Sequence, residues 1–365
     1  MDLTSVPLFS AVSVNEGLDL FTPLKRVLDR HWYVLGDEVA NFEREFAQYI
    51  GVSNCITVAN GTDALELALR GLDVKKGDQV VTVANAGFYG STAIHAIGAA
   101  PLYVDVNYAT LTMSVASLAK ALEQRPKAVI VTHLYGQIAD ILEIMDLCRA
   151  SKVPIIEDCA QSHGAILNGK QAGSFGTISC FSFYPTKNLG ALGDGGAIMT
   201  NDIDLANRIR ALRQYGWSQK YQVTTAGGRN SRLDEMQAAI LREKLPYLAR
   251  WNELRRNIAH RFNQSFSTLP LVRPSSVGED YVAHLYVLRV KYRQKFREFL
   301  KTRGIETSVH YPLPDYRQPA YPYSGNIRLE VTETACESVV SLPCFPGLSG
   351  VNIDRVIEAV SEYFQ

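Results

Sequence analysis

Lys187 has the clearest chemical potential in the chain, because it lies between an apolar run and a glycine-rich segment in FSFYPTKNLGALGDGG, residues 181–196. So many glycines are not typical of a helix on an ordinary soluble surface. A lysine held near a cationic centre and away from bulk water loses part of its proton affinity and becomes a usable amine nucleophile. The surroundings of Lys187 therefore suggest a Schiff base with an aldehyde.

Two carboxylates, Glu157 and Asp158, end the strongly apolar segment VPIIED, residues 153–158. A carboxylate at the mouth of a buried strand is costly unless a cation meets it, and a protonated ring nitrogen would serve. A structural ion pair or a helix cap is an equally good interpretation of Asp158 alone. His163, further along the chain, is either a proton carrier or a satisfied buried polar group.

The segment ANGTDALELAL, residues 59–69, places Gly61, Thr62 and Asp63 at the start of a helix. The free N–H groups and partial positive charge of a helix start favour a phosphate, and Gly61 allows close backbone approach. Capping of the helix by Thr62 or Asp63 is the alternative. An amine for an aldehyde, a carboxylate for a ring nitrogen and a helix start for a phosphate are together what pyridoxal phosphate requires.

The elements that must position these residues alternate between short β-rich runs and helical runs from about residue 55 to 200. This alternation predicts an α/β fold with a mostly parallel sheet covered by helices. Such sheets bind ligands outside the carboxyl ends of their strands. The expected strands are 79–83, 100–106, 127–133, 153–158, 177–183 and 196–200, and the expected helices between them are 63–72, 92–99 and 140–150.

After residue 200 the pattern becomes helical to about residue 265, with two helices meeting near Pro246. A strand-like run at 281–290, a helical run at 293–304 and a terminal helix suggest a smaller α+β domain. We expect residues 1–245 to form a large α/β domain that includes the N-terminal segment. Residues 246–365 would form the smaller C-terminal domain.

Composition and motifs exclude several classes of function. The 37 basic and 37 acidic residues balance, so no whole-chain field would attract nucleic acid or anionic lipid. No apolar stretch is long enough to cross a membrane, and the N-terminus lacks a signal-like pattern, which predicts a cytoplasmic protein. The six cysteines show no paired short spacing, so we expect buried thiols and no metal site. Walker, GxGxxG and GxSxG motifs are absent from the places that nucleotide-binding and hydrolase folds need them.

The chain resembles the DegT/DnrJ/EryC1/StrS family of sugar aminotransferases, which have the aspartate aminotransferase fold (fold type I). The likeness extends over nearly the whole chain. Its motifs are NGTDAL (60–65), GDQVV (77–81), EDCAQSHGA (157–165), SFYPTKNLGALGDGGAIMT (182–200), RQYGWSQKY (213–221), GRNSRLDEMQAA (228–239), the Trp251–Asn252 pair and HYPLPDYRQPAY (310–321).

The resemblance implies a role for each matching residue. Lys187 would hold pyridoxal phosphate as a Schiff base, Asp158 would pair with its ring nitrogen, and Gln161 would bind its phenolic oxygen. The phosphate ligands would be Gly61, Thr62 and Ser182, with Asn230 reaching the phosphate of a neighbouring subunit. That contact implies a homodimer with shared active sites. Candidates for gripping the sugar or the nucleotide diphosphate are His163, Tyr184, Lys220, Tyr221, His310 and Tyr311, with surface or packing roles as alternatives.

The chain departs from the family at the ring that stacks on the cofactor. The family usually has an aromatic residue at the position occupied here by Gly87, within ANAGFYGSTA. Phe88 or Tyr89 would have to supply the ring, and the sequence does not choose between them.

The segments around Lys187, at NSRLDE and at residues 310–321 are similar to those of family members that act on 3-keto-6-deoxy sugars. The implied reaction transfers the amino group of L-glutamate to a nucleotide-linked 3-keto-6-deoxyhexose, usually on dTDP, with pyridoxamine phosphate as the intermediate cofactor form. Its product would enter deoxysugar biosynthesis for lipopolysaccharide or another glycan. The alternatives are transfer to a 4-keto sugar and a non-enzymatic regulator that binds pyridoxal phosphate. The related dehydratases replace the lysine with histidine, so Lys187 speaks against that class.

Overall fold

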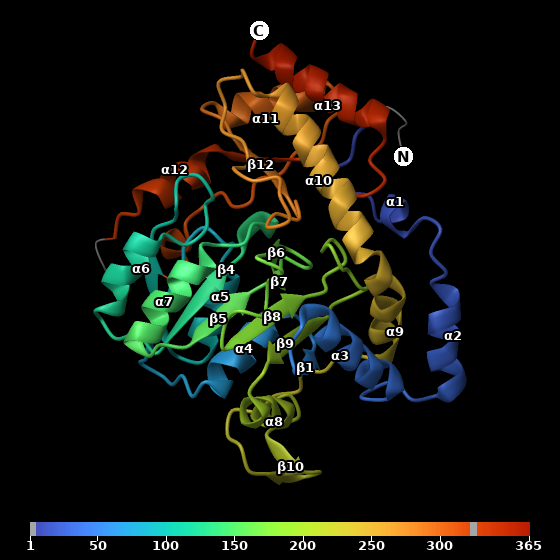
Figure 1. Ribbon diagram of the computed structural model, residues 1–365, viewed down its shortest axis with the longest axis vertical. Helices are drawn as coiled ribbons and strands as arrows, with labels where there is room; N and C mark the ends of the chain where they lie inside the picture. Colours follow the sequence, from blue (N-terminus) through green and yellow to red (C-terminus); the bar gives the residue numbers. More distant parts are fainter. Residues whose placement is uncertain (1–4, 322–326) are drawn as a thin grey trace.

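A seven-stranded sheet forms the centre of the computed structural model, which describes residues 5–321 and 327–365 (Figure 1). Its strands are β1 (Asn54–Val58), β2 (Gln79–Val83), β3 (Ala100–Val104), β4 (Ala128–Thr132), β5 (Ile155–Asp158), β8 (Ile178–Ser182) and β9 (Gly196–Thr200). They are ordered β1-β9-β8-β5-β4-β2-β3. β9 runs antiparallel to β1 and β8, and the other neighbours are parallel. The expected mostly parallel, mixed sheet is confirmed, with β1 as an additional edge strand.

Helices cover both faces of the sheet, which is why its strands are almost continuously apolar. One core contains side chains of α3 (Asp37–Ile50), α6 (Val115–Leu122), α7 (Ile141–Ser151) and α9 (Glu235–Lys244). The core on the other face contains side chains of α4 (Gly61–Gly71), α5 (Tyr89–Ala96) and α8 (Ile203–Leu212). The two cores hold the carboxyl ends of the strands in fixed positions relative to one another.

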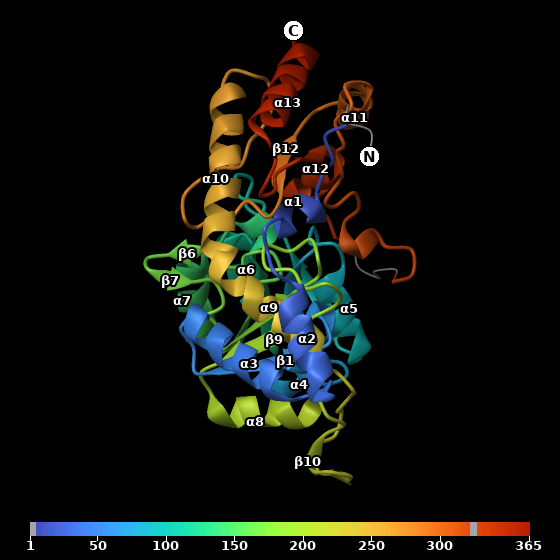
Figure 2. The ribbon, with the colours of Figure 1, turned by 90° about the vertical axis from the view of Figure 1, so that its right-hand side faces the viewer.

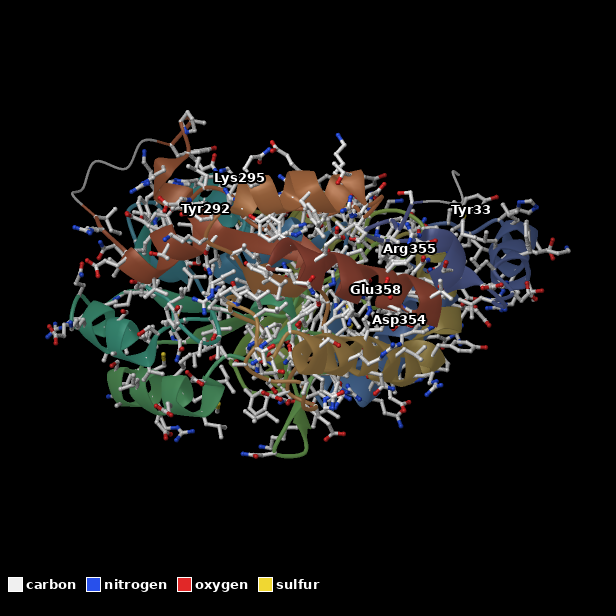
Figure 3. All side chains as sticks on the ribbon, turned by 90° about the horizontal axis from the view of Figure 1, so that it is seen from above. Tyr33, Tyr292, Lys295, Asp354, Arg355 and Glu358 are labelled. Carbon is white, nitrogen blue, oxygen red and sulfur yellow. The ribbon has the colours of Figure 1, made fainter. Side chains whose placement is uncertain are left out.

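A second layer of structure lies above the sheet in Figure 1. It contains α10 (Leu248–Ser265), α11 (Arg293–Thr302), α12 (Glu330–Ser338), α13 (Gly350–Tyr363) and the antiparallel pair β12 (Tyr286–Arg289) and β13 (Val339–Leu342). Figure 2 shows α10 rising from the level of the sheet into this layer. Seen from above in Figure 3, α13 lies between α10 and α11, and Arg261 of α10 pairs with Asp354 of α13.

Short elements connect and extend the two layers. They are α1 (Ala11–Asn15), α2 (Phe21–Arg30), the strand pairs β6 (Ile166–Leu167) with β7 (Lys170–Gln171) and β10 (Trp217–Gln219) with β11 (Gln222–Val223), and 3-10 turns at Leu134–Gly136, Leu245–Tyr247 and Asp315–Arg317. The turn at Leu245–Tyr247 separates α9 from α10 at Pro246, as expected. Val6 bridges to Ile305 and packs in the core of the second layer, so the start of the chain contacts that layer. The proposed division at residues 245 and 246 remains a prediction.

Among the described residues, no helix has the length and apolar character needed to cross a membrane.

Candidate active site

A cavity of about 610 Å³ lies where the ends of the sheet strands face the second layer. Thr132, Asp158 and Ser182 line it from the carboxyl ends of β4, β5 and β8. The start of α4 and the segment around Lys187 line the same side, and residues of the second layer close the cavity from above. This is the position expected for a ligand on a parallel sheet.

Lys187 is half-buried in the wall of this cavity, in a turn where its backbone N–H donates to the carbonyl of Tyr184 at 2.8 Å. Burial lowers its pKa from 10.5 to about 8, although the negative charge of Asp158 acts in the opposite direction. Its Nζ makes no hydrogen bond or ion pair with any residue that the structure describes. The side chain is therefore an available amine, and its lowered pKa makes the unprotonated form much more abundant at neutral to slightly alkaline pH than in an ordinary lysine.

Asp158 is buried at the end of β5 and faces the same cavity. Its carboxylate accepts hydrogen bonds from Thr132 Oγ1 at 3.3 Å and from the N–H of Ala160 at 3.2 Å. Burial raises its pKa, and the charge of Lys187 partly opposes this effect. No cation among the described residues lies within ion-pair distance of Asp158. A buried carboxylate with two long hydrogen bonds has the capacity to receive a protonated ring nitrogen.

Glu157, the other carboxylate of the pair, points away from the cavity and is saturated with hydrogen bonds. It accepts three backbone N–H groups of the turn 173–176, and His133 Nε2 lies 2.9 Å from it. His133 Nδ1 accepts from the N–H of Ala139, which assigns the ring proton to Nε2. His133, Glu157 and Cys159 are close enough to share a metal ion, but these hydrogen bonds already use the histidine and glutamate atoms. The network instead fixes the end of β5, from which Asp158 points to the opposite side.

The start of α4 forms an anion site beside Ser182. The Asn60 side chain caps the helix by accepting from the N–H of Asp63 at 2.8 Å. The N–H groups of Gly61 and Thr62 have no partner among the described residues, so both are available to a ligand. A Cβ at Gly61 would lie 2.7 Å from Ser182 Cβ, so only glycine allows β8 and the helix to come this close.

Gln161 is oriented by its contacts on both sides of the amide. Its Oε1 accepts from the N–H of Tyr135 at 2.6 Å, and its Nε2 donates to the hydroxyl of Tyr311 at 3.2 Å. The amide nitrogen therefore faces the cavity as a donor. Together with Lys187, Asp158 and the anion site, this arrangement fits pyridoxal phosphate: an aldehyde, a ring nitrogen, a phenolic oxygen and a phosphate each meet a complementary group.

The glycine at position 87 is explained by the second layer. Gly87 has a φ of +81°, and a Cβ there would lie 2.7 Å from the ring of Tyr311. Tyr311 thus occupies the space that a larger side chain at position 87 would need. Tyr89 lines the cavity with its ring 6.2 Å from that of Tyr311, whereas Phe88 packs on His95 and Tyr321 outside the cavity lining. The position favours Tyr89 as the stacking residue.

Asp315 connects this aromatic loop to the second layer. Its buried carboxylate accepts from the N–H of Phe88 at 3.1 Å and from Ser91 Oγ at 2.6 Å. Its own N–H donates to the carbonyl of Ala84. Burial raises the pKa of Asp315 to about 6. The carboxylate therefore holds residues 84–91 in place beside Tyr311.

The structure does not bring every sequence-predicted residue into the cavity. His163 is fully buried against Phe181 and Phe183, and burial lowers its pKa to about 3, so its ring is neutral and packs beneath the site. This position does not support the expected role as a proton carrier. The predicted residues that line the cavity are Gly61, Thr62, Tyr89, Asp158, Gln161, Ser182, Tyr184, Lys187, His310 and Tyr311.

Lys220, Tyr221 and Asn230 are exposed and do not line the cavity of their own chain. The first two belong to the β10–β11 hairpin, which projects from the end of the molecule opposite the second layer (Figures 1 and 2). A role for these three residues therefore depends on a second copy of the chain.

Sequence reasoning missed two residues of the upper wall, Arg255 and His284. The His284 Nδ1 lies 3.0 Å from Asn188 Oδ1, and burial lowers the pKa of His284. Arg255 had a detectable signal, because it falls on the buried face of α10 with Trp251, Ile258 and Phe262. An arginine among the regularly spaced apolar residues of a helix is unusual and indicates that its charge is buried.

Comparisons with known proteins agree with this geometry. The model of the DegT/DnrJ/EryC1/StrS aminotransferase family matches residues 16–361. The dTDP-3-amino-3,6-dideoxy-alpha-D-galactopyranose transaminase of Aneurinibacillus thermoaerophilus is 45% identical, over 93% of this chain and 94% of its own. The UDP-N-acetyl-3-dehydro-alpha-D-glucosamine 3-aminotransferase of Acidithiobacillus ferrooxidans is 38% identical, over 94% and 93%. The crystal structure of S. venezuelae DesV in complex with a ketimine intermediate matches with a TM-score of 0.95 at 39% identity and covers 99% of both chains.

Proposed function

This chain belongs to the DegT/DnrJ/EryC1/StrS aminotransferase family and is a pyridoxal-phosphate-dependent sugar aminotransferase, and we propose that it aminates C3 of a nucleotide-linked 3-keto-6-deoxyhexose. The amino donor in this proposal is L-glutamate, and the preferred nucleotide is dTDP. The products would be a dTDP-3-amino-3,6-dideoxyhexose and 2-oxoglutarate.

The observation that carries the proposal is one cavity that contains an available amine at Lys187 opposite a buried, unpaired carboxylate at Asp158. When bound, pyridoxal phosphate supplies an electron sink that stabilises negative charge at the donor's α-carbon. The Lys187 amine, with its lowered pKa, would accept the proton from that carbon and donate it again later in the reaction. Asp158 keeps a proton on the ring nitrogen, and the N–H groups at the start of α4 hold the phosphate.

The choice of C3 rests on the relatives. Two of the relatives most similar to this chain carry names that place the amino group at C3, one on a dTDP sugar and one on a UDP sugar. The dTDP sugar is favoured because that relative shares more of its sequence with this chain, at 45% against 38%. The sugar would be held between Tyr184, which follows β8, and His310 and Tyr311 of the second layer, all of which line the cavity.

We further propose that the protein is a homodimer whose two subunits share their active sites, and that it is located in the cytoplasm. Large apolar side chains are exposed on α2, on the loop that follows it and on the β10–β11 hairpin, including Phe21 at 86%, Trp32 at 63% and Tyr221 at 79%. Exposed aromatic residues on several elements are typical of a surface that another chain covers. Asn230, close to the hairpin, would then reach the partner's cofactor phosphate. All six cysteines are unpaired thiols, in keeping with a reducing compartment.

The deciding experiment offers the purified holoenzyme L-glutamate and a panel of ketosugars. The panel holds a dTDP-linked 3-keto-6-deoxyhexose, its 4-keto isomer and a UDP-linked 3-keto-N-acetylglucosamine, with products identified by mass spectrometry and NMR. We expect an amine at C3 of the dTDP sugar, and turnover only at C4 would overturn the proposal. Failure to aminate any of the three sugars would also overturn the proposed substrate.

Two controls accompany this assay. Lys187→Ala should abolish both turnover and the absorbance of the covalently attached cofactor, whereas Lys170→Ala, at the exposed start of β7, should change neither. Sedimentation of the active enzyme should show a dimer, and full activity in a monomer would contradict the shared site.

A further inference from the structure

Arg255 is a buried cation in the upper wall of the cavity with no acidic partner. Its side chain extends from α10, is 2% exposed and lines the cavity. The Nη1 donates to the carbonyl of Cys344 at 2.6 Å and to those of Ala283 and His284 at 3.4 Å each. The structure gives no hydrogen bond for Nε or Nη2 within its described residues, and no carboxylate there forms an ion pair with Arg255.

A buried guanidinium with two unused nitrogens is costly unless a ligand supplies the missing acceptor. Burial lowers the pKa of Arg255 only to about 10, so the side chain remains a cation at neutral pH. Its Nε and Nη2 form one edge of the planar guanidinium. Two N–H groups on one edge match the two oxygens of a carboxylate.

Arg255 and the reacting lysine line one cavity. Leu8, Phe9, Leu342 and Cys344 line the same cavity as apolar or weakly polar groups, and the Cys344 carbonyl contacts Arg255 directly. Arg255 and Lys187 both lower the pKa of His284, so the two cations lie within electrostatic range of the same ring. A molecule bound between them would place an amino group near the reacting amine and an acid near the arginine.

We propose that Arg255 binds a carboxylate of the amino donor and of the 2-oxo acid it becomes, through the unpaired Nε and Nη2 edge. This inference rests on the proposed transaminase function, because it assigns the donor's position in that same cavity. The phosphate site at the start of α4 belongs to other residues, Gly61, Thr62 and Ser182. A single guanidinium edge matches one carboxylate, and a nucleoside diphosphate would bring more charge than one cation balances.

The test measures donor binding to the holoenzyme without any ketosugar. Glutarate, which has both acids and no amine, is titrated by calorimetry, and the L-glutamate half-reaction is followed through the cofactor absorbance. We expect Arg255→Gln to weaken both apparent affinities by about tenfold to a hundredfold, as for a lost charge-assisted hydrogen-bonded pair. Arg255→Lys keeps the positive charge but lacks the two parallel N–H groups, so its affinities should lie between those of the wild type and Arg255→Gln. The matched control Arg256→Gln removes the neighbouring arginine of α10, which does not line the cavity, and should leave both affinities unchanged.

Amide analogues identify which acid is bound. L-glutamine and L-isoglutamine each replace one of the two acids of glutamate with an amide. The analogue without the acid that faces Arg255 should bind weakly to the wild type, and Arg255→Gln should not weaken its binding further. The proposal would be overturned if Arg255→Gln weakened the binding of both analogues as much as it weakens the binding of L-glutamate. If the variant does not fold, the wild type still decides the question, since equal affinities for glutarate and its diamide would also overturn it.

Two further outcomes separate this role from its competitors. If Arg255 only ties three carbonyls together, Arg255→Gln will lower the unfolding temperature while the glutarate affinity stays, and the proposal fails. If the variant weakens dTDP binding as much as glutarate binding, the site holds the nucleotide and the proposal also fails. If Arg255→Gln weakens glutarate binding but the wild type aminates none of the sugars, the proposed function fails and the carboxylate site at Arg255 stands.

Discussion

Replacing Gly61 with alanine tests whether the start of α4 and Ser182 must touch to hold a phosphate. The new Cβ would lie 2.7 Å from Ser182 Cβ and 3.3 Å from its Cα, distances that require one element to move. Overpacking of this kind costs about 1–3 kcal/mol, and the helix-interior advantage of alanine over glycine does not apply, because Gly61 is the first residue of α4. If α4 moves away from Ser182, cofactor affinity falls. If it does not move, the fold loses stability.

The assay therefore measures both quantities. We expect the loss in unfolding free energy of the apoenzyme and the loss in pyridoxal phosphate binding free energy to sum to about 1–3 kcal/mol. If all of it falls on binding, the dissociation constant rises about fivefold to 150-fold. Gly350→Ala is the control, because Gly350 also begins a capped helix, α13, but has no atom within 4 Å of its added Cβ. Unchanged stability together with unchanged binding in Gly61→Ala would refute the reasoning.

Three further predictions concern the aromatic loop and two titrating groups. Tyr89→Ala should weaken cofactor binding about twofold to tenfold, as expected for a stacked ring worth about 0.5–1.5 kcal/mol, whereas Phe88→Ala should leave the dissociation constant unchanged; equilibrium titration of the apoenzyme checks both, and equal effects would contradict the assignment. Burial raises the pKa of Asp315 from 3.8 to about 6, so the folded state binds more protons than the unfolded state between these values. Unfolding free energy should therefore fall by up to about 3 kcal/mol as pH rises through that window and stay level above it; denaturant titrations of wild type and Asp315→Asn measure this, and an equal slope in the variant would exclude Asp315 as its source. Burial lowers the pKa of Lys187 to about 8, and only its unprotonated amine attacks. The rate of cofactor attachment to the apoenzyme should rise with pH, reach half of its maximum near pH 8 and level off above that pH. A rate whose midpoint lies near the ordinary lysine pKa would contradict this.

Local pattern was sufficient to predict the fold class and the principal chemical groups. The strands expected at 79–83 and 196–200 have those bounds, and other elements differ by a few residues at their ends, where hydrogen bonding and not composition decides. Lys187, Asp158 and the start of α4 were found because each lies beside a strong signal in the chain itself. An apolar strand, a glycine-rich segment and a helix start are all local properties.

Long-range contacts were needed for the rest of the site. Arg255 meets the carbonyls of Ala283, His284 and Cys344 only after α10 packs against the second layer, so no window of the sequence contains its environment. His163 sits only a few residues from Asp158, but the turn after β5 directs its side chain into the core instead of the cavity. Its nearness to Asp158 in the sequence therefore suggested a catalytic role for His163, but the tertiary packing places the His163 ring outside the cavity.

The aromatic loop shows the same division. The sequence by itself determined that a glycine stands at position 87 and that two aromatic residues follow it. Only the tertiary structure decided which of them faces the cavity, because Tyr311 fills the space above Gly87 and Asp315 holds the N–H of Phe88. The spacing of residue types can be read from neighbours along the chain. The direction of these two side chains depends instead on Tyr311 and Asp315, more than two hundred positions away, which approach only when both layers are folded.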